Sequence, residues 1–397
     1  MREVPLQVTL RHAKAWAPLA GIQSVRDITA MDCLGVPVFI SERRPGAYPY
    51  AFGKGRVPAE AEVGAYMEAI ESYVSEPDIA RLETRYGPPS MLSGARAGCD
   101  PILEFAPKLG CDPVQSLLLV CAEDVESGAK NWLPAELVFN PASPGAGASL
   151  YGASSNGLAS GNSVLEASVH ALYELIERDI WSIEFIRNRA SWVDHADLPR
   201  DAQSIAAAAA SNGVQLVVRY VPNDYGLPFF AAFLFEPNRF ERSLFNGGWG
   251  CHPQREIALM RAVTEAAQSR LAFRSGLCEP EKSEVLGTEA ERVSQQIEAI
   301  SSRRPAIRFA DIPQLPETTK VGEEWAAAVN YLRRVIDRPI YRVVYTRAEG
   351  PLHVVRLIVP LLEHFTPSTN RMGPRMRAEL EALARESAQF SQEPSPV

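Results

Sequence analysis

Several signatures of common enzyme classes are absent from the 397-residue sequence. It has no GxxxxGKS or GxxxxGKT segment, which excludes a P-loop, and no GxGxxG after a strand, no HRD and no DFG, which argues against a Rossmann site and a protein kinase. Its six cysteines form no CxxC pair, and their spacings fit no zinc site. No apolar run approaches the roughly 20 residues of a membrane-spanning helix, and the N-terminus lacks a signal-peptide core. We therefore expect a cytoplasmic protein with reduced thiols.

The composition is that of a globular chain: hydrophobic residues make up 46%, charged residues 22%, and the net charge is −8. A negative chain is not expected to bind nucleic acid. The length favours one large domain of intimately packed subdomains over residues 1–389, followed by a flexible Pro/Ser tail over 390–397.

Helical and strand patterns mix along the whole chain, which predicts the α/β or α+β class. Residues 1–50 are expected to hold β-like pieces. The predicted helices are 58–76, 162–179, 199–212, 256–273, 288–302, 322–335 and 373–388, and the predicted strands are 116–124, 136–140, 214–220, 227–235, 340–346 and 353–359.

The most informative stretch reads GLASGNSVLEASVHALYELIERD, from Gly157 to Asp179. On a helix Glu166, Glu174 and Glu177 fall at i, i+8 and i+11, within roughly 80° of one another, and Asn162 projects into the same sector. Carboxylates on one face repel each other, and a cation between them would relieve that repulsion. Magnesium, which prefers oxygen ligands and commonly bridges to phosphates, is the natural candidate. The alternative is an ordinary solvated face, because Glu is a good helix former.

The same arrangement recurs on two further predicted helices. In AEVGAYMEAIESY, Glu68 and Glu71 lie at i, i+3 on one face, shortly after the GKG at 53–55. In REIALMRAVTEAAQSRL, Arg261 and Glu265 lie at i, i+4, just after the Gly-rich GGWGCH. Taken singly, the first is also explained by two exposed glutamates and the second by an ordinary helical ion pair.

Together, three helices with clustered glutamates and Gly-rich approaches predict a site for a polyanion and metal ions. Carboxylates alone repel a triphosphate, so such a site needs magnesium together with cations aimed at phosphate oxygens. Lys54, Arg178 and Arg261 are the available cations. The adjacent Cys251 and His252 are not expected to form a nucleophile pair, since neighbouring residues rarely face each other.

With these motifs the chain resembles the YcaO family, which uses ATP to activate backbone amides of peptides. The resemblance runs over most of the chain: the segment from Gly157 to Asp179 is similar to the central signature of the family, and RDITAMDCLGVPVF and GKG also fit. MEAIESY is similar to the ExxE motif of the family, with Ser72 where the family usually has Arg and Gly64 where it often has Ser. GCHPQREIALMRAVTEAAQSRL matches the third motif through its RxxxE pair.

The resemblance implies a YcaO-type ATP-binding fold with several mixed sheets and packed helices, and ATP and Mg²⁺ as cofactors. It also implies a role for each motif residue. The Mg²⁺ ligands would be Glu68, Glu71, Glu166, Glu177 and Glu265, and the contacts to ATP and its phosphates would come from Lys54, Asn162, Glu174, Arg178 and Arg261.

In the chemistry that the resemblance implies, a nucleophile adds to an amide carbonyl, the oxyanion attacks the γ-phosphate of ATP, and phosphate departs. An external sulfide gives a thioamide, a Cys, Ser or Thr side chain gives an azoline, and an amine gives an amidine. The segments TAMDCLGVPVF, VPNDYGLPFFAAF and VVRLIVPLLE resemble the thioamide-forming branch that works with a TfuA-like partner. The C-terminal EPSPV partly matches the PxPxP ending of azoline-forming members, so azoline formation stays the alternative.

Nothing in the sequence resembles a fused ubiquitin-activating-enzyme-like domain or a leader-peptide-binding winged helix. We therefore expect a peptide substrate together with a separate TfuA-like sulfur-delivering partner or a leader-peptide-binding protein, and no nucleic acid or membrane partner. The family resemblance also allows a homodimer. An alternative of another class is a non-catalytic ATP-binding subunit that assembles a peptide-modifying complex.

Overall fold

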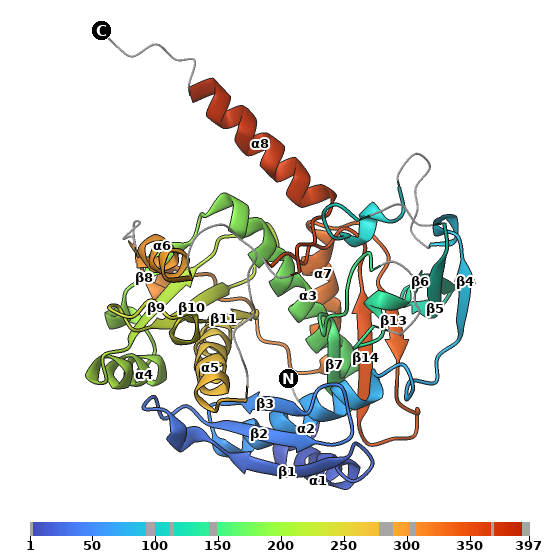
Figure 1. Ribbon diagram of the computed structural model, residues 1–397, viewed down its shortest axis with the longest axis horizontal. Helices are drawn as coiled ribbons and strands as arrows, with labels where there is room; N and C mark the ends of the chain where they lie inside the picture. The colour runs from blue at the N-terminus through green and yellow to red at the C-terminus, as the bar shows by residue number, and fades with distance from the viewer. Residues whose placement is uncertain are drawn as a thin grey trace.

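The computed structural model describes residues 3–92, 100–111, 115–142, 149–277, 289–301, 306–366 and 369–390. The described chain folds into three β-sheets with helices packed between and around them (Figure 1). The expected mixture of helices and sheets is confirmed. The helices are α1 Leu6–Trp16, α2 Pro58–Val74, α3 Val164–Arg187, α4 Arg200–Ser211, α5 Arg255–Arg274, α6 Glu289–Ser301, α7 Val321–Arg333 and α8 Pro374–Phe390.

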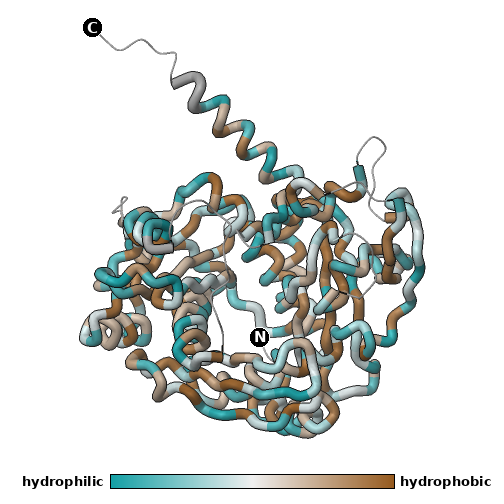
Figure 2. Tube along the Cα trace, viewed as in Figure 1, coloured by the Kyte–Doolittle hydropathy of each residue, from teal (hydrophilic) through white to brown (hydrophobic). Residues whose placement is uncertain are grey.

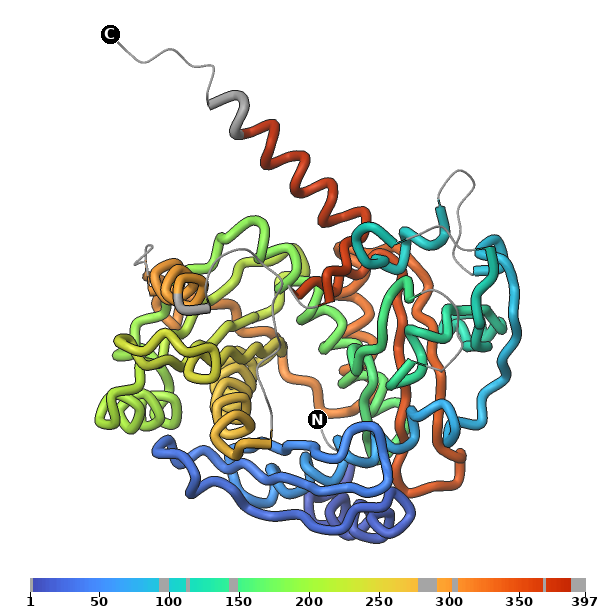
Figure 3. The backbone as a smooth tube through the Cα atoms, in the orientation of Figure 1, coloured from blue at the N-terminus to red at the C-terminus, as the bar shows by residue number. Residues whose placement is uncertain are grey.

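Each sheet is almost entirely antiparallel. The first has the order β1-β2-β3, the second β11-β10-β9-β8-β12 with only β8 and β12 parallel, and the third β4-β5-β13-β14-β7 with β6 paired to β5. Figure 3 shows the blue N-terminal sheet below the other two. The strands are β1 Ile22–Asp27, β2 Val38–Arg43, β3 Tyr50–Lys54, β4 Thr84–Gly87, β5 Leu117–Asp124, β6 Lys130–Pro134, β7 Leu158–Gly161, β8 Ser191–Val193, β9 Gln215–Tyr220, β10 Phe229–Phe235, β11 Asn246–Cys251, β12 Ala306–Ile307, β13 Tyr341–Val344 and β14 His353–Ile358.

The β-like pieces expected within residues 1–50 are confirmed as β1 and β2. The region also begins with helix α1, which was not predicted; its buried Leu10 and Ala13 lie at i, i+3 on the face that packs against α2. One strand prediction is wrong. The stretch 136–140 is no strand, since a 3-10 turn over Ala135–Leu137 follows Pro134 at the end of β6. The predicted tail begins one residue early, because α8 extends to Phe390; the remaining tail residues lie outside the described part of the chain.

Helix α8 projects away from the rest of the described chain (Figure 1). Its turns alternate between hydrophilic and hydrophobic residues in Figure 2, as in an amphipathic helix. Arg187, the last residue of α3, forms ion pairs with Glu379 and Glu386 of α8 and so connects the two helices.

Helix α3 is the central element, because it packs on β7, β14 and α7 and also touches β11 of the second sheet. Its N-terminus is capped by Ser163, whose hydroxyl accepts the backbone N–H of Glu166 at 3.0 Å. Farther along, the buried Asp179 accepts the Glu363 backbone N–H at 2.8 Å and the Tyr225 hydroxyl at 2.6 Å. These contacts fix both the position and the rotation of α3, and therefore where its glutamates point.

Glycines allow two strands to lie directly against helices. A Cβ added to Gly53 on β3 would lie 2.1 Å from the backbone oxygen of Ala61 on α2, and one added to Gly250 on β11 would lie 2.0 Å from the oxygen of Ala258 on α5. Gly64 faces Gly53, and a Cβ there would lie 3.1 Å from the Cα of Gly53. The close approach of β3 to α2 explains why position 64 holds a small residue. It also brings the end of β3 next to α2 and α5.

We expect Gly53→Ala to destabilise the protein by about 3 kcal/mol or more, because backbone atoms on a packed helix cannot move aside cheaply. The matched control is Gly322→Ala near the start of α7, where an added Cβ meets nothing within 4 Å. That change should be neutral or stabilise by up to about 1 kcal/mol. Urea unfolding of the three proteins measures both effects, and equal midpoints would contradict the close packing of β3 on α2.

Candidate metal and nucleotide site

The site is organised around Glu265 of α5. The Lys54 ammonium, at the end of β3, lies 2.5 Å from Glu265 Oε2, and Arg178 Nη2, on α3, lies 3.8 Å from Glu265 Oε1. The same Arg178 nitrogen lies 3.9 Å from Glu177 Oε1. Three predicted motifs that are far apart in the sequence therefore meet through their charged side chains.

The backbone of strand β11 forms hydrogen bonds with two side chains of the predicted site, Glu177 and Arg261. The Cys251 N–H donates to Glu177 Oε2 at 2.9 Å, and Arg261 Nη1 donates to the Cys251 carbonyl at 3.2 Å. The Trp249 ring lies 5.6 Å from the Arg178 guanidinium, in cation–π range. Burial raises the pKa of the Cys251 thiol well above its usual value, and burial lowers that of His252 to about 3. Neither group is suited to nucleophilic catalysis, as the sequence predicts.

Helix α2 contributes Glu68 and Glu71. Glu71 is buried and accepts a hydrogen bond from the hydroxyl of Ser160 on β7. Burial raises its pKa well above the usual value, and the Glu68 carboxylate raises it further. Solvent reaches the Glu68 side chain, yet desolvation also raises its pKa.

On α3, burial raises the pKa of Glu174 to about 7, with Glu177 and Glu68 adding to the rise while Arg178 opposes it. Burial likewise raises the pKa of Glu177, against the lowering effect of Arg178. Glu265 differs, because Lys54 and Arg178 together outweigh its burial and lower its pKa. Burial works against the charge of Arg178, but the surrounding carboxylates raise its pKa overall.

The charges in this cluster do not balance. Five carboxylates share the cluster with three cations, and four of the five have raised pKa values. A divalent cation would relieve that excess, so the donor set fits Mg²⁺. Among the described residues no three carboxylate, His or Cys side chains already converge tightly enough to hold a metal ion. Mg²⁺ keeps few protein ligands and commonly adds phosphate oxygens, so an open set of carboxylates suits a metal that arrives with a nucleotide.

Asn162 and Glu166 form a separate pair at the start of α3. Asn162 Nδ2 donates to both Glu166 oxygens at 2.9 and 3.1 Å, and the Thr9 hydroxyl donates to Asn162 Oδ1 at 3.0 Å. Glu166 also accepts the Glu3 backbone N–H at 3.0 Å. Glu166 lies about 12 Å along the helix axis from Glu174, a separation comparable to the length of a nucleotide. The structure thus divides the predicted residues into a charged cluster from β3, α2, α3 and α5 and a polar pair at the start of α3.

Sequence reasoning missed three contributors. Ser160 lies within the Gly157–Asp179 segment. It is a polar, partly exposed residue between buried neighbours on β7, and that position was the available indication. The sequence could not indicate the contact of the Cys251 N–H, because every residue except proline has a backbone N–H. Arg356 on β14 lowers the pKa of Glu174 through its charge; it lies in the VVRLIVPLLE segment, but the sequence does not link it to the site.

The fold and the cluster define a class of protein in which acidic helices meet around Lys54 and Arg178, without a P-loop sequence. The family described as "YcaO cyclodehydratase, ATP- and Mg²⁺-binding" matches residues 52–363. An uncharacterized protein of Methanothermobacter thermautotrophicus is 30% identical over 371 residues, which are 91% of this chain and 95% of that protein. An uncharacterized protein in the tfuA 3′ region of Rhizobium leguminosarum bv. trifolii is 28% identical, over 86% of this chain and 84% of that protein. The chain belongs to the YcaO family.

Solved structures share the fold. YcaO from Methanopyrus kandleri, bound with AMPPCP and Mg²⁺, superposes with a TM-score of 0.71 at 22% identity, over 94% of this chain and 95% of that one. A heterocyclase in complex with substrate and cofactor gives 0.75 at 19% identity, over 94% of this chain and 54% of that one, so the chain spans about half of its length. A chain of the Escherichia coli microcin synthetase McbBCD complex with pro-MccB17 bound gives 0.59 at 13% identity, over 84% of this chain and 87% of that one.

The YcaO-type fold expected from the sequence is therefore confirmed, and the family is one that binds ATP and Mg²⁺. Among the described helices, none has both the length and the apolar character that crossing a bilayer requires.

Proposed function

We propose that this protein uses ATP to activate a backbone amide of a peptide by O-phosphorylation, and that the product is a thioamide in a ribosomally made peptide. The observation that carries the proposal is the cluster in which carboxylates of α2, α3 and α5 meet Lys54 and Arg178. Such a cluster suits a nucleotide triphosphate with Mg²⁺ and little else.

We propose a role for each residue of the predicted site. Glu68, Glu71 and Glu177 would hold Mg²⁺, with Glu265 and Glu166 serving further metal positions, and bound Mg²⁺ would neutralise charge on the β- and γ-phosphates. The cationic side chains Lys54, Arg178 and Arg261 would contact phosphate oxygens. Glu174 and Asn162 would contact the nucleotide. The ion pair between Lys54 and Glu265 would open as phosphate takes its place, because one ammonium can serve either anion.

The protein groups then position the reactants. A sulfide adds to the amide carbon, the resulting oxyanion displaces ADP at the γ-phosphorus, and the phosphorylated oxygen leaves as phosphate while the C=S bond forms. Each transfer needs alignment and charge neutralisation more than proton transfer by the protein.

The thioamide product is favoured by the relative encoded in the tfuA 3′ region, together with the segments that resemble the TfuA-associated branch. We therefore propose a TfuA-like protein as the partner that delivers sulfur, in the cytoplasm, where thiols stay reduced. Azoline formation is the second candidate, because the family carries the cyclodehydratase name and related solved proteins are a heterocyclase and a microcin synthetase.

Mass spectrometry of peptides from the native host, with and without this gene, tests the proposal. We expect a peptide that carries sulfur in place of one oxygen and reverts to the unmodified mass when the gene is deleted. Loss of water in place of that exchange would assign azoline formation, and an unchanged set of peptide masses would contradict both functions. Capture of the tagged protein from the same host should retain a TfuA-like protein; its absence would count against the proposed partner.

A further inference from the structure

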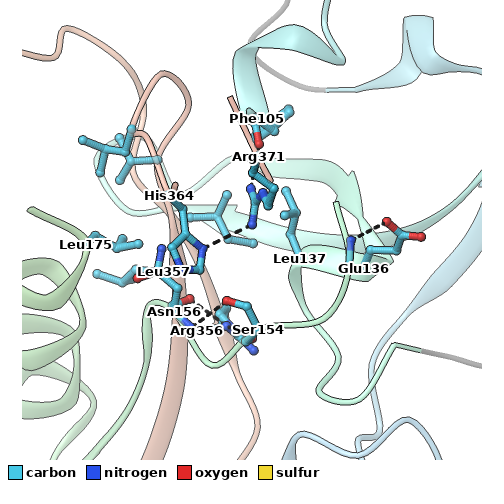
Figure 4. Close-up of a pocket in the computed structure, with 14 residues that line it drawn as sticks. Phe105, Glu136, Leu137, Ser154, Asn156, Leu175, Arg356, Leu357, His364 and Arg371 are labelled. Atoms are coloured by element: carbon cyan, nitrogen blue, oxygen red, sulfur yellow. Dashed lines mark hydrogen bonds between the residues drawn. The ribbon is translucent and has the colours of Figure 1, made fainter. Parts of the chain in front are cut away.

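A small cavity of about 40 Å³ lies between β14 and the segment that precedes β7 (Figure 4). Its walls come from β14, from the segment before β7 and from the stretch that follows β14. Leu175 of α3 also lines it, so the cavity borders the residue next to Glu174. None of the residues predicted for the ATP and Mg²⁺ site lines this cavity.

Two buried guanidiniums line the cavity. Arg356 is 1% exposed, and its Nη1 donates to the carbonyls of Ser154 at 2.8 Å and Asn156 at 2.6 Å. Its Nε has no hydrogen-bond partner. Arg371 is 6% exposed and donates from Nε and Nη2 to the carbonyls of Ala106 and Phe105, both at 2.8 Å.

Both arginines are therefore held by neutral backbone oxygens. In the described part of the chain neither one forms an ion pair with a carboxylate. The acidic side chain at the cavity wall, Glu136, is already engaged, since its Oε2 accepts the backbone N–H groups of Tyr151 at 2.7 Å and Gly152 at 3.2 Å. Glu363 and Glu136 favour the charge of Arg371 from a distance, as Glu174 does for Arg356, but among the described residues no carboxylate oxygen lies within ion-pair distance of either guanidinium.

His364 completes the arrangement. Arg371 Nη1 lies 3.4 Å from His364 Nδ1, and burial, with Arg371 adding to it, lowers the pKa of His364 well below the usual value. A neutral ring that accepts at Nδ1 carries its proton on Nε2, which is then a donor. Figure 4 shows Arg371 beside His364 and Arg356 beside Ser154 and Asn156, all lining the same cavity.

Unpaired buried charges are costly, and the cost is removed when a counter-ion binds. We propose that this cavity binds a small inorganic anion between Arg356 and Arg371. The volume admits only a few non-hydrogen atoms, which excludes a peptide or a nucleotide. If the proposed thioamide function holds, the reaction consumes hydrosulfide and releases phosphate, and both have the chemistry that this cavity recognises.

Bromide provides a direct probe, because its anomalous scattering locates it in crystals of the full-length protein. We expect a bromide peak in the cavity of the wild-type protein and none in Arg371→Gln. Leu137→Phe is a second variant, which keeps both arginines and fills the cavity from its lining. Leu137→Phe should also show no bromide peak, so this variant tests the proposal even if Arg371→Gln does not fold.

Arg338→Gln is the matched control, because it removes an arginine that is already paired with Glu104, with Nε lying 3.0 Å from Oε2. It should keep the peak. No peak in the wild-type protein, or a peak that persists in Arg371→Gln and Leu137→Phe, would overturn the proposal.

Competition identifies the natural anion. Hydrosulfide or phosphate added before bromide should abolish the peak, and the anion that does so at the lower concentration is the occupant. If neither displaces bromide, the site holds an adventitious ion only and the proposal fails. Glu177→Gln should keep bromide binding unchanged, so a failure of the proposed ATP function remains distinguishable from a failure of the anion site.

Discussion

Glu177→Gln is expected to reduce peptide modification by about 100-fold or more while the protein stays folded. Glutamine keeps the size of the side chain and can still accept the Cys251 N–H, which Glu177 accepts at 2.9 Å. It removes the negative charge that we propose for Mg²⁺. The measurement is the amount of modified peptide in a host that lacks the gene and is complemented with each variant.

The control lies on the same helix. Glu184 is also buried and also accepts a backbone N–H, that of Ala190 at 2.6 Å, but it lies at the far end of α3, away from the charged cluster. Glu184→Gln should therefore leave modification within about twofold of the wild type, at a stability cost on the order of 1 kcal/mol. Wild-type levels of modified peptide with Glu177→Gln would contradict the site assignment and favour the non-catalytic assembly subunit.

Raising the pH from about 5 to 8 is expected to destabilise the metal-free protein. Glu174 has a pKa near 7 in the fold and 4.5 as its ordinary value, so its contribution is complete below 4.5 and is lost as the pH rises through 7. A shift of this size corresponds to roughly 3 kcal/mol. Glu68 and Glu71 act in the same direction. Glu265, with a lowered pKa, contributes nearly constantly over this range.

Mg²⁺ should reverse most of this loss, because it stabilises the ionised carboxylates and binds better as they lose their protons. Urea unfolding at several pH values, with EDTA or with Mg²⁺, measures the effect. Glu174→Gln should flatten the slope in EDTA. Burial also raises the pKa of Glu184, so Glu184→Gln should lower the slope as well, yet leave the Mg²⁺ effect intact. The lowered pKa values of His252 and His364 act in the opposite direction below about pH 6.5, so the carboxylate effect is measured by the difference between variants. An equal slope in EDTA for Glu174→Gln and the wild type would contradict the surplus of carboxylates.

The sequence predicts which side chains lie together where one helix carries the information. A periodicity of 3.6 residues is enough to place Glu174 and Glu177 on one face, and the structure brings both into the charged cluster. The same reasoning grouped Glu166 with them, but it lies about two turns away and binds Asn162 and the Glu3 backbone. A helical wheel reports the face of a residue and ignores its height along the axis.

Contacts between distant segments could not be predicted from local patterns. The pair of Lys54 and Glu265 spans 211 positions and depends on glycines that let β3 and β11 lie against helices. The contact of Arg261 Nη1 with the Cys251 carbonyl likewise depends on the packing of β11 on α5. The wrong strand at 136–140 has a similar cause, because buried Glu136 bonds to backbone groups from a later segment.

Calorimetric titration of the purified protein with AMPPCP, in Mg²⁺ and in EDTA, tests the central claim most directly. The claim is that clustered carboxylates bind a nucleotide only through divalent cations. We predict binding in Mg²⁺ and none in EDTA, because without the metal the carboxylates repel the triphosphate. Equal affinity under both conditions would contradict it.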